Sequence, residues 1–398
     1  MKKINILLSI LVLALAPSVV QAQNNGFREI LSGIVEKNLA LKAMDRQVYA
    51  EKLTNKSGNY LSDPEIEVAR LWSDPSSNPN RTDFSVSQEI DLSVIRGTMR
   101  QVSDSRNMLL DLEYVQERLN VQLEAAEALC QLEYCNEMET VLTERIELYT
   151  RVANGYARQL ESGNSGRLEL NKARLVLAGL ESDLRKNRIE KQAVLSTLRS
   201  LNGGEEFNPE VRNLQVGEVP ADFEQWYNQT KEINPYLTYS LKEIDVMKAE
   251  QQVSKEANLP KLKVGYTSEL VPGDKYRGVS VGVAIPVWSN ANRRKYADAA
   301  VLSARMHQAD VEVQEKERML SLYDRAKGLD DVMTSYMEEL NTLDNSELLS
   351  KALSEGEISF LDYVVEMDMV FNAIDASVEM KRDRNMALAE LLSISDFQ

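Results

Sequence analysis

The sequence predicts a mainly α-helical protein with a small antiparallel β part, on the strength of three observations. The 398-residue chain is 27% charged and only 6% aromatic, with 10 Pro and 17 Gly. This composition is typical of long helices rather than of a β-sandwich or a doubly wound sheet. Four short stretches nevertheless alternate apolar and polar residues with a period of two. The third observation is that the same order of parts occurs twice along the chain.

A signal peptide, two repeats and a linker are the expected divisions of the chain. Residues 1–22 have the positive start, apolar middle and small-x-small end of a cleaved signal peptide, so we expect an exported protein. No Cys follows the expected cleavage site, and we therefore expect no lipid anchor there. The first repeat is expected over 23–204, the linker over 205–222 and the second repeat over 223–398.

Each repeat is expected to contain a helix, a β-hairpin, a very long helix, a glycine turn and a returning helix. The expected opening helices are 28–58 and 222–258. The hairpin strands, which follow Pro64 and Pro260, are expected at 65–72 with 83–92 and at 261–268 with 278–288. The long helices are expected at 93–154 and 290–354, the turns near Gly163 and Gly356, and the returning helices at 168–202 and 360–393.

The long helices cannot be stable alone. A helix of about 60 residues reaches roughly 90 Å, which is more than a globule of this mass spans. Apolar residues recur at coiled-coil spacing, as in Leu109, Leu112, Val115, Leu119, Leu123 and Ala126. We therefore expect these helices to pack side by side.

The strand expected at 278–288 has two unlike faces. Val279, Val281, Val283, Ile285 and Val287 alternate with Ser280, Gly282, Ala284 and Pro286. The strand lengths suit tilted membrane strands, and Trp72, Tyr266, Tyr276 and Trp288 are expected at their rims. We therefore predict that the Val/Ile face meets lipid and that the small, polar face lines a watery lumen. The alternative is a small soluble sheet whose apolar face is covered by helix.

Four strands cannot close a barrel, and an open strand edge is not tolerated in lipid. A membrane protein of this kind must therefore assemble from several copies. Two copies would supply eight strands, whose interior is filled by side chains, whereas three copies would supply twelve and leave a lumen. A homotrimer is therefore expected for a channel.

Composition argues against several other functions. The formal net charge of −16 makes nucleic acid and anionic lipid surfaces poor partners. The single histidine, His307, leaves no basis for a His-based triad or metal site, and we expect no enzyme activity, cofactor or metal. Cys130 and Cys135 are five residues apart in a helical stretch, on different faces, so free thiols are expected rather than a disulfide or a metal pair.

Several motifs, in order and in both repeats, resemble those of the TolC-like outer-membrane efflux proteins. They are "SGNSGRLELNKARLVLAGLESDL" at 162–184, "NPYL" at 234–237, "LPKLKVGYT" at 259–267, "GVAIPVWSNANRRKYADAA" at 282–300 and "GEISFLDYVVEMDMVFNA" at 356–373. The resemblance covers the whole mature chain. Departures include Asn38-Leu39 where the family prefers Asn-Pro, Asp91 where the second repeat has Pro286, and the lack of a lipid-anchor Cys.

This resemblance implies a homotrimer in the outer membrane of a Gram-negative envelope. Its twelve-stranded β-barrel would continue into a twelve-helix α-barrel across the periplasm. The implied function is the passive exit duct of a tripartite efflux pump or a type I secretion system. The implied partners are outer-membrane lipid, a periplasmic adaptor (membrane fusion protein) and an inner-membrane transporter of the RND or ABC type.

The resemblance also suggests two sets of site residues. Asp362 matches a family aspartate that lines the periplasmic constriction, with Glu366 one turn further on and Glu169 as the weaker equivalent in the first repeat. The alternative is that Asp362 is an ordinary exposed carboxylate or a cap of its helix. Adaptor docking is expected at the turns, with the candidates Arg158, Leu160, Gly163, Leu353, Gly356 and Leu361. Each glycine also has a purely structural explanation, since a turn between helices needs a residue with positive φ.

A function from another class stays open. A soluble periplasmic coiled-coil adaptor or scaffold would also combine long helices with a little sheet. An adaptor is expected to interrupt one central helical hairpin with modules rich in strands and glycine. The two equal repeats of this chain favour the duct.

Overall fold

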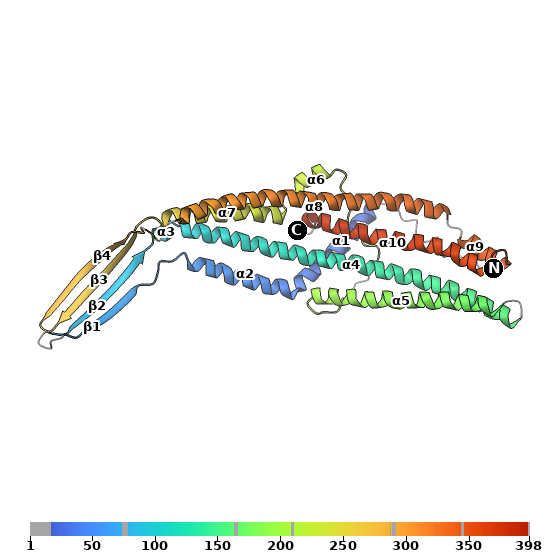
Figure 1. Cartoon of the computed structure of the whole chain (residues 1–398), viewed down its shortest axis with the longest axis horizontal. Helices are drawn as coiled ribbons and strands as arrows, with labels where there is room; N and C mark the ends of the chain where they lie inside the picture. Colours follow the sequence, from blue (N-terminus) through green and yellow to red (C-terminus); the bar gives the residue numbers. More distant parts are fainter. Residues whose placement is uncertain are drawn as a thin grey trace. The chain divides into compact units, whose positions relative to one another are not determined.

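The computed structural model describes residues 17–73, 79–162, 166–207, 211–286, 288, 292–343 and 346–396 (Figure 1). The first half of the chain contains α1 (Pro17–Lys37), α2 (Leu39–Ser57), β1 (Glu65–Leu71), β2 (Arg81–Ile90), α3 (Leu92–Ile95), α4 (Thr98–Glu161) and α5 (Arg167–Leu201). The second half contains α6 (Phe223–Thr230), α7 (Pro235–Glu256), β3 (Lys261–Val271), β4 (Asp274–Ala284), α8 (Arg293–Leu343), α9 (Ser346–Glu355) and α10 (Phe360–Asp396). The predicted order of parts is thus present twice. Helix α1 begins inside the predicted signal peptide, the rest of which lies outside the described residues.

The prediction of one continuous opening helix in each repeat is wrong, because an asparagine interrupts both. Asn234 caps α7: its side-chain oxygen accepts hydrogen bonds from the backbone N–H groups of Tyr236 and Leu237, at 2.9 and 3.3 Å. Its amide nitrogen donates to the Glu315 carboxylate at 2.9 Å. Asn38 separates α1 from α2 and donates to the carbonyl of Leu201 at 3.0 Å. Both asparagines are buried, so each break is held by buried hydrogen bonds.

The long helices differ in their ends from the prediction. Helix α4 has 64 residues, begins after Gly97 (φ 76°) and continues to Glu161, past the predicted end at 154. The second long helix is described in two parts, α8 up to Leu343 and α9 from Ser346, and the two residues between them lie outside the described residues. Among the described residues, no helix combines the length and apolar content needed to cross a membrane.

Cys130 and Cys135, both on α4, are buried free thiols, as predicted. Burial raises the pKa of the Cys135 thiol to about 11. The Cys135 thiol is therefore protonated at neutral pH, and the side chain contributes to packing.

Two compact units make up the chain, and each takes segments from both repeats. We call Ala40–Glu117 with Lys231–Lys316 the sheet-bearing unit. We call Met1–Leu39, Arg118–Thr230 and Glu317–Gln398 the tip-bearing unit. The compact units therefore do not coincide with the two repeats, whose boundaries remain predictions from the sequence.

In the sheet-bearing unit, side-chain contacts give the helix order α2, α4, α7, α8. Asn55 of α2 donates to Asn107 of α4 at 2.9 Å. Tyr239 of α7 donates to Glu113 of α4 at 3.0 Å, and Gln251 of α7 donates to Asp298 of α8 at 2.7 Å. Helices α2 and α8 are therefore the outer members of this row.

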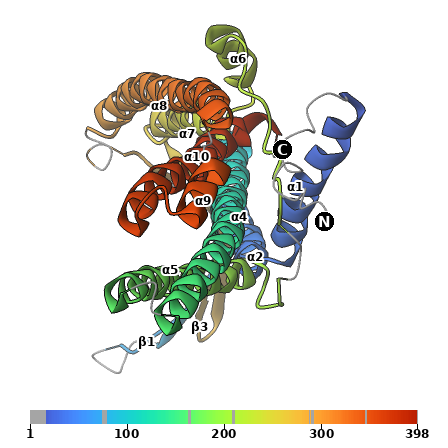
Figure 2. The same cartoon turned by 90° about the vertical axis from the view of Figure 1, so that its right-hand side faces the viewer.

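The tip-bearing unit joins two helical hairpins, α4–α5 and α9–α10, through one apolar cluster (Figure 2). The cluster, called the tip core below, contains the buried residues Tyr149, Ala153, Ala173, Phe360, Tyr363 and Met367. Tyr149 makes edge-to-face contacts with Tyr363 and Phe371, at ring-centroid distances of 6.3 and 6.2 Å. Because the core draws on α4, α5 and α10, and Leu349 and Leu353 of α9 pack against it, it holds the ends of the two hairpins together.

Gly203 is predicted to be irreplaceable, whereas its neighbour Gly204 is not. Both have positive φ, but a Cβ on Gly203 would lie 2.5 Å from the carbonyl oxygen of Lys37, and a Cβ on Gly204 would meet nothing within 4 Å. Gly204→Ala should cost about 1 kcal/mol in unfolding free energy, from backbone strain alone. Gly203→Ala should cost clearly more, since backbone must also shift. Denaturant unfolding followed by circular dichroism would measure both, and equal losses would contradict the steric argument.

Removing the hydroxyl of Tyr149 should not destabilise the tip core. Within the described part of the chain, this buried hydroxyl has no hydrogen-bond partner, and burial raises its pKa. Tyr149→Phe deletes a buried polar group without a partner, so the unfolding free energy should stay equal or rise by up to about 1 kcal/mol. Tyr149→Ala should instead lose about 3–5 kcal/mol through the cavity that it leaves. A loss above about 1 kcal/mol for Tyr149→Phe in the same measurement would show that the hydroxyl does have a partner.

Candidate functional site

The four strands form one antiparallel sheet in the order β1-β2-β3-β4. Strand β2 of the first repeat pairs with β3 of the second, so the two hairpins join edge to edge. Pro272 and Gly273, with φ 97° at the glycine, connect β3 to β4 in a tight turn. Among the described residues, the outer edges of β1 and β4 have no partner strand.

One face of the sheet is apolar. In one cross-strand row, Ile66 pairs with Val86, Val86 with Tyr266 and Tyr266 with Val279. Alternation along each strand places further apolar residues on the same face. They are Val68, Phe84, Ile90, Leu262, Val264, Leu270, Val281 and Val283.

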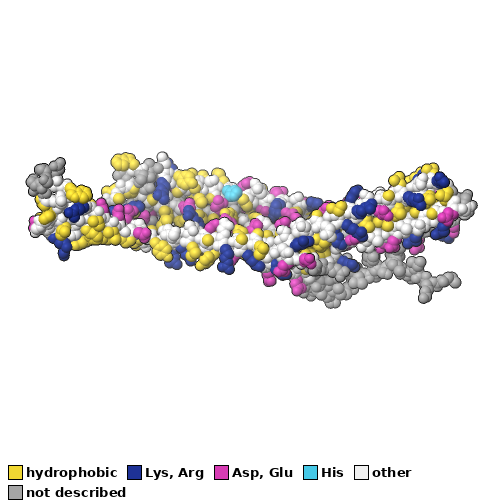
Figure 3. Space-filling model, turned by 90° about the horizontal axis from the view of Figure 1, so that it is seen from below, with side chains coloured by type: hydrophobic (Ala, Val, Ile, Leu, Met, Phe, Trp, Pro, Cys, Tyr) yellow, Lys and Arg dark blue, Asp and Glu magenta, His cyan; other side chains and the backbone are white. Residues whose placement is uncertain are grey.

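None of the described helices shields this apolar face. Val279 is 85% exposed and Val281 71% exposed, although both lie inside a regular strand. Figure 3 shows apolar side chains gathered on the surface at the left of the view, over the strands. An exposed apolar patch of this kind on a regular sheet marks a surface that meets lipid or another protein.

The opposite face is polar and carries ion pairs across the strands. Lys263 of β3 reaches over β2 to Glu65 of β1 at 2.8 Å. Lys261 pairs with Glu89 at 2.8 Å, and Arg81 pairs with Glu269 at 3.1 Å. On β4 this face is nearly flat, because its side chains there are Gly278, Ser280, Gly282 and Ala284.

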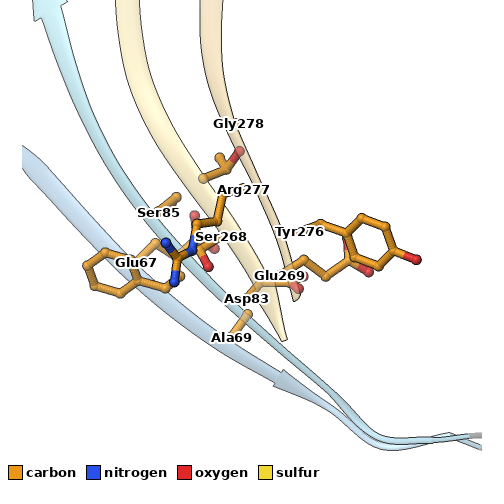
Figure 4. Close-up of a pocket in the computed structure, with 11 residues that line it drawn as sticks. Glu67, Ala69, Asp83, Ser85, Ser268, Glu269, Tyr276, Arg277 and Gly278 are labelled. Carbon is orange, nitrogen blue, oxygen red and sulfur yellow. The ribbon is translucent and has the colours of Figure 1, made fainter. Parts of the chain in front are cut away.

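A hollow of about 490 Å³ lies along the polar face. Figure 4 shows the residues around it, which come from all four strands, for example Glu67, Asp83, Glu269 and Tyr276. Most lining side chains belong to the polar face, so the hollow lies on that face. A polar, hollowed side is what the interior of a water-filled barrel requires.

The predicted ends of the strands need correction. Strand β4 was expected to run from 278 to 288 but covers Asp274–Ala284, and β2 ends at Ile90 instead of 92. The β3–β4 ladder stops at the pair Lys261 and Ala284 because the next positions approach Pro260 and Pro286, which have no N–H to donate. Ile285 is exposed but lies beyond the strand, and Val287 is outside the described residues.

The aromatic residues expected at the rims divide into two groups. Trp72 and Trp288 follow the ends of β1 and β4 and are exposed, as a rim position requires. Tyr266, however, is the middle residue of β3, on the apolar face, and Tyr276 lies on the polar face. The rim prediction is therefore wrong for both tyrosines.

At the second helix turn, Gly356 has the left-handed conformation predicted for it, with φ 78°. Its N–H donates to the carbonyl of Leu353, and the N–H of Glu357 donates to the carbonyl of Ala352, at 3.2 and 2.9 Å. This pair of bonds is a Schellman motif, which ends α9. A Cβ on Gly356 would meet nothing within 4 Å, so the glycine is needed for its φ and not for space. Gly163, the predicted equivalent, lies outside the described residues.

Asp362 caps its own helix. Its carboxylate accepts hydrogen bonds from the Ser359 N–H at 3.3 Å and the Ser359 hydroxyl at 2.6 Å. The Asp362 N–H donates back to the Ser359 hydroxyl at 3.2 Å, which completes a capping box. The capping interpretation, left open by the sequence, is thus correct, and the Asp362 side chain is exposed.

Glu366 lies one turn further along the same exposed face of α10, next to the exposed apolar residues Leu361, Val365 and Met369. Glu169 is in the first turn of α5, where its carboxylate is 3.8 Å from Lys172. Of the three predicted constriction residues, Glu169 and Asp362 therefore lie in the first turns of α5 and α10, and Glu366 lies in the second turn of α10.

The predicted docking residues lie around the tip core. Leu353 packs against it, whereas Arg158 is exposed in the last turn of α4 and Leu361 is 57% exposed. Leu160 is half-buried. Leu353 thus has a packing function that the sequence did not suggest, and the exposed Arg158 and Leu361 are the better candidates for contact with a partner.

Two features of the site were missed in the sequence. Ser359 could have been found, because Ser-x-x-Asp before an apolar run is a helix-start signal. The buried ion pair of Arg145 with Asp375 could not, since the two residues are 230 positions apart.

Comparison with solved structures identifies the fold. The outer-membrane channel CmeC of Campylobacter jejuni matches with a TM-score of 0.78 at 17% identity, over 93% of this chain and 86% of that one. The Neisseria gonorrhoeae channel MtrE, in its open state, matches with a TM-score of 0.76 at 12% identity, over 92% and 88%. The Vibrio cholerae outer membrane protein VceC matches with a TM-score of 0.76 at 12% identity, over 95% and 98%.

Comparisons of the amino-acid sequence find no match. No family model matches it, and a search of curated proteins finds no relative. The structural matches nevertheless extend over almost the whole chain and over both repeats. The chain therefore has the fold of the TolC-like outer-membrane channels.

Proposed function

We propose that the protein is the passive exit duct of an efflux pump or type I secretion system in the outer membrane. The observation that carries this proposal is the sheet: one face is apolar and is not covered by any described part of the chain, and the other carries charged side chains and a hollow. A sheet that meets lipid on one side and a watery lumen on the other needs this division. The channels of known structure that share the fold support the same assignment.

Assembly as a homotrimer completes the barrel in this proposal. Strands β1 and β4 run in opposite directions, so β4 of one copy can pair antiparallel with β1 of the next. Three copies supply twelve strands, enough for a lumen. The outer helices of the sheet-bearing unit fit the same plan, because α2 exposes Tyr49 and Leu53 and α8 exposes Leu302, Met306 and Val313. These apolar stripes would pack between neighbouring copies.

The tips would contact the rest of the pump. A periplasmic adaptor and an inner-membrane transporter, of the RND or ABC type, are the partners that the resemblance implies. The exposed side chains Arg158 and Leu361, beside the turns of the two hairpins, would meet the adaptor. In a trimer, Asp362 and Glu366 would become rings of three carboxylates at the constriction, which attract cations and repel anions.

The alternative function is a soluble periplasmic adaptor or scaffold. It would need a cover for the apolar face of the sheet, and the exposure of Val279 and Val281 speaks against one within the described chain. The channel requires this face to meet lipid, whereas the soluble adaptor requires it to be covered. Substitutions on the two sides of β4 therefore separate them.

Val281→Arg and Ser280→Arg form a matched pair, since the residues are adjacent and face opposite sides of β4. If the Val281 face meets lipid, Val281→Arg should cost about 2–4 kcal/mol per copy, and the protein should disappear from the outer membrane. Ser280→Arg, on the lumen side, should leave membrane insertion intact. Fractionation of the cell envelope and migration of the unheated protein on a gel would measure both. Recovery of wild type as a soluble periplasmic monomer, or equal tolerance of the two substitutions, would contradict the channel.

The constriction can be tested with Asp362→Asn. Asparagine keeps an oxygen that can accept the hydrogen bonds from Ser359 but removes the charge. In planar bilayers, the variant should show lower cation selectivity or higher conductance than wild type, and Glu366→Gln should add to the effect. Glu347→Gln, which removes an exposed carboxylate from α9 instead of α10, serves as the control. Unchanged conductance and selectivity in Asp362→Asn would count against the ring.

A further inference from the structure

Helix α10 is held in two different ways along its length. In its C-terminal part, charged side chains join it to both neighbours in the tip-bearing unit. Lys381 pairs with Glu133 of α4 at 3.0 Å, and Arg384 pairs with Asp330 of α8 at 2.6 Å. Arg318 of α8 pairs with Glu390 at 2.6 Å.

Toward the tip, the contacts of α10 with α4 are aromatic, and Tyr363 also makes a hydrogen bond with Ser350 of α9 at 3.4 Å. Phe360 packs edge-to-face on Tyr156 of α4 at 5.4 Å, and Tyr363 packs on Tyr149 at 6.3 Å. Such contacts resist separation of the helices but allow small sliding more readily than a fixed hydrogen-bond geometry does. The segment 360–374, called the tip segment below, carries both Asp362 and Glu366.

One charged contact stands at the boundary between these two parts. Arg145 of α4 pairs with Asp375, and among the described residues this is the ion pair of α10 nearest to the tip. The guanidinium donates to both carboxylate oxygens of Asp375 and, at 3.1 Å, to the carbonyl of Phe371. It also lies over the Phe371 ring, 4.4 Å from the ring centroid.

This contact is buried and fixed in orientation. The Arg145 side chain is only 7% exposed, so its charge is largely removed from water and depends on Asp375. A planar guanidinium with three hydrogen bonds and a stacked ring fixes both the height and the rotation of α10 against α4. Lysine, with a point charge on a flexible chain, could keep the attraction but not this geometry.

We infer that Arg145 is a positioning residue: it fixes α10 on α4 at Phe371 and Asp375 and thereby sets the place of Asp362 and Glu366. The inference rests on the proposed channel function, in which those carboxylates line the constriction. The tip segment between Arg145 and the turn at Gly356 is then the part of α10 that can shift, while the part beyond Asp375 stays tied to α4 and α8.

Hydrogen exchange of the full-length, assembled protein tests the inference, with mass spectrometry resolving the tip segment from residues 376–396. In Arg145→Met, exchange of the tip segment should become at least tenfold faster, while residues 376–396 keep the wild-type rate. Arg145→Lys should lie between the two. Arg384→Met, which removes the pair with Asp330, is the matched control and should leave the tip segment unchanged. If Arg145→Met does not assemble, Asp375→Asn, which preserves the side-chain volume, should give the same local change.

Bilayer recordings of the same variants provide the functional measurement. Arg145→Met should raise conductance or lower cation selectivity, and Arg145→Lys should partly restore the wild-type values. If Arg145→Met accelerates exchange equally in both parts of α10, or not at all in the tip segment, the inference is wrong. The proposed channel function would not be affected by that result. A wild-type protein that inserts no conducting channel would instead overturn the proposed function, whatever the exchange pattern.

Discussion

The structure depends on a constraint that one chain cannot satisfy by itself. Its four-stranded sheet has an apolar face that no described residue covers, a charged opposite face, and two outer strand edges that no described strand pairs with. Neither water alone nor lipid alone suits such a sheet. The helices of the sheet-bearing unit repeat the pattern, since the outer members α2 and α8 expose apolar side chains. In the proposed trimer, sheet and helices would both form part of a wall that the other two copies close.

The predicted tandem duplication would explain how one chain builds such a wall. The two repeats fold side by side, so that each compact unit takes about half of its elements from each. Asn38 and Asn234 mark equivalent breaks, but they bond differently: one donates to a carbonyl, whereas the other caps a helix and contacts Glu315. At the tip, local residues define the turn, namely Gly356 and the capping box of Ser359 and Asp362. Residues distant in sequence hold this turn in place.

Local patterns allowed much of the fold and part of the site to be predicted from the sequence. Alternation found all four strands and the two faces of β4, because side-chain direction in a strand follows from residue number alone. Strand ends were predicted less well, since β4 ends where its partner β3 begins, after Pro260. A capping function of Asp362 was among the alternatives, but its partner Ser359 was missed although the Ser-x-x-Asp pattern is visible in the sequence. The contact of Arg145 with Asp375 could not be predicted, because the sequence around each residue does not specify a partner 230 positions away.

The junction between β2 and β3 has a consequence for how the protein folds. Val86 and Tyr266 are neighbours in the sheet, yet about half of the chain lies between them in sequence. Contacts of such long range form late, because a large loop must close first. The first hairpin therefore exposes its apolar side chains and unpaired strand edges until the second hairpin is available to pair with it. During that interval the chain is most prone to aggregation, and a holding chaperone would have its greatest effect there.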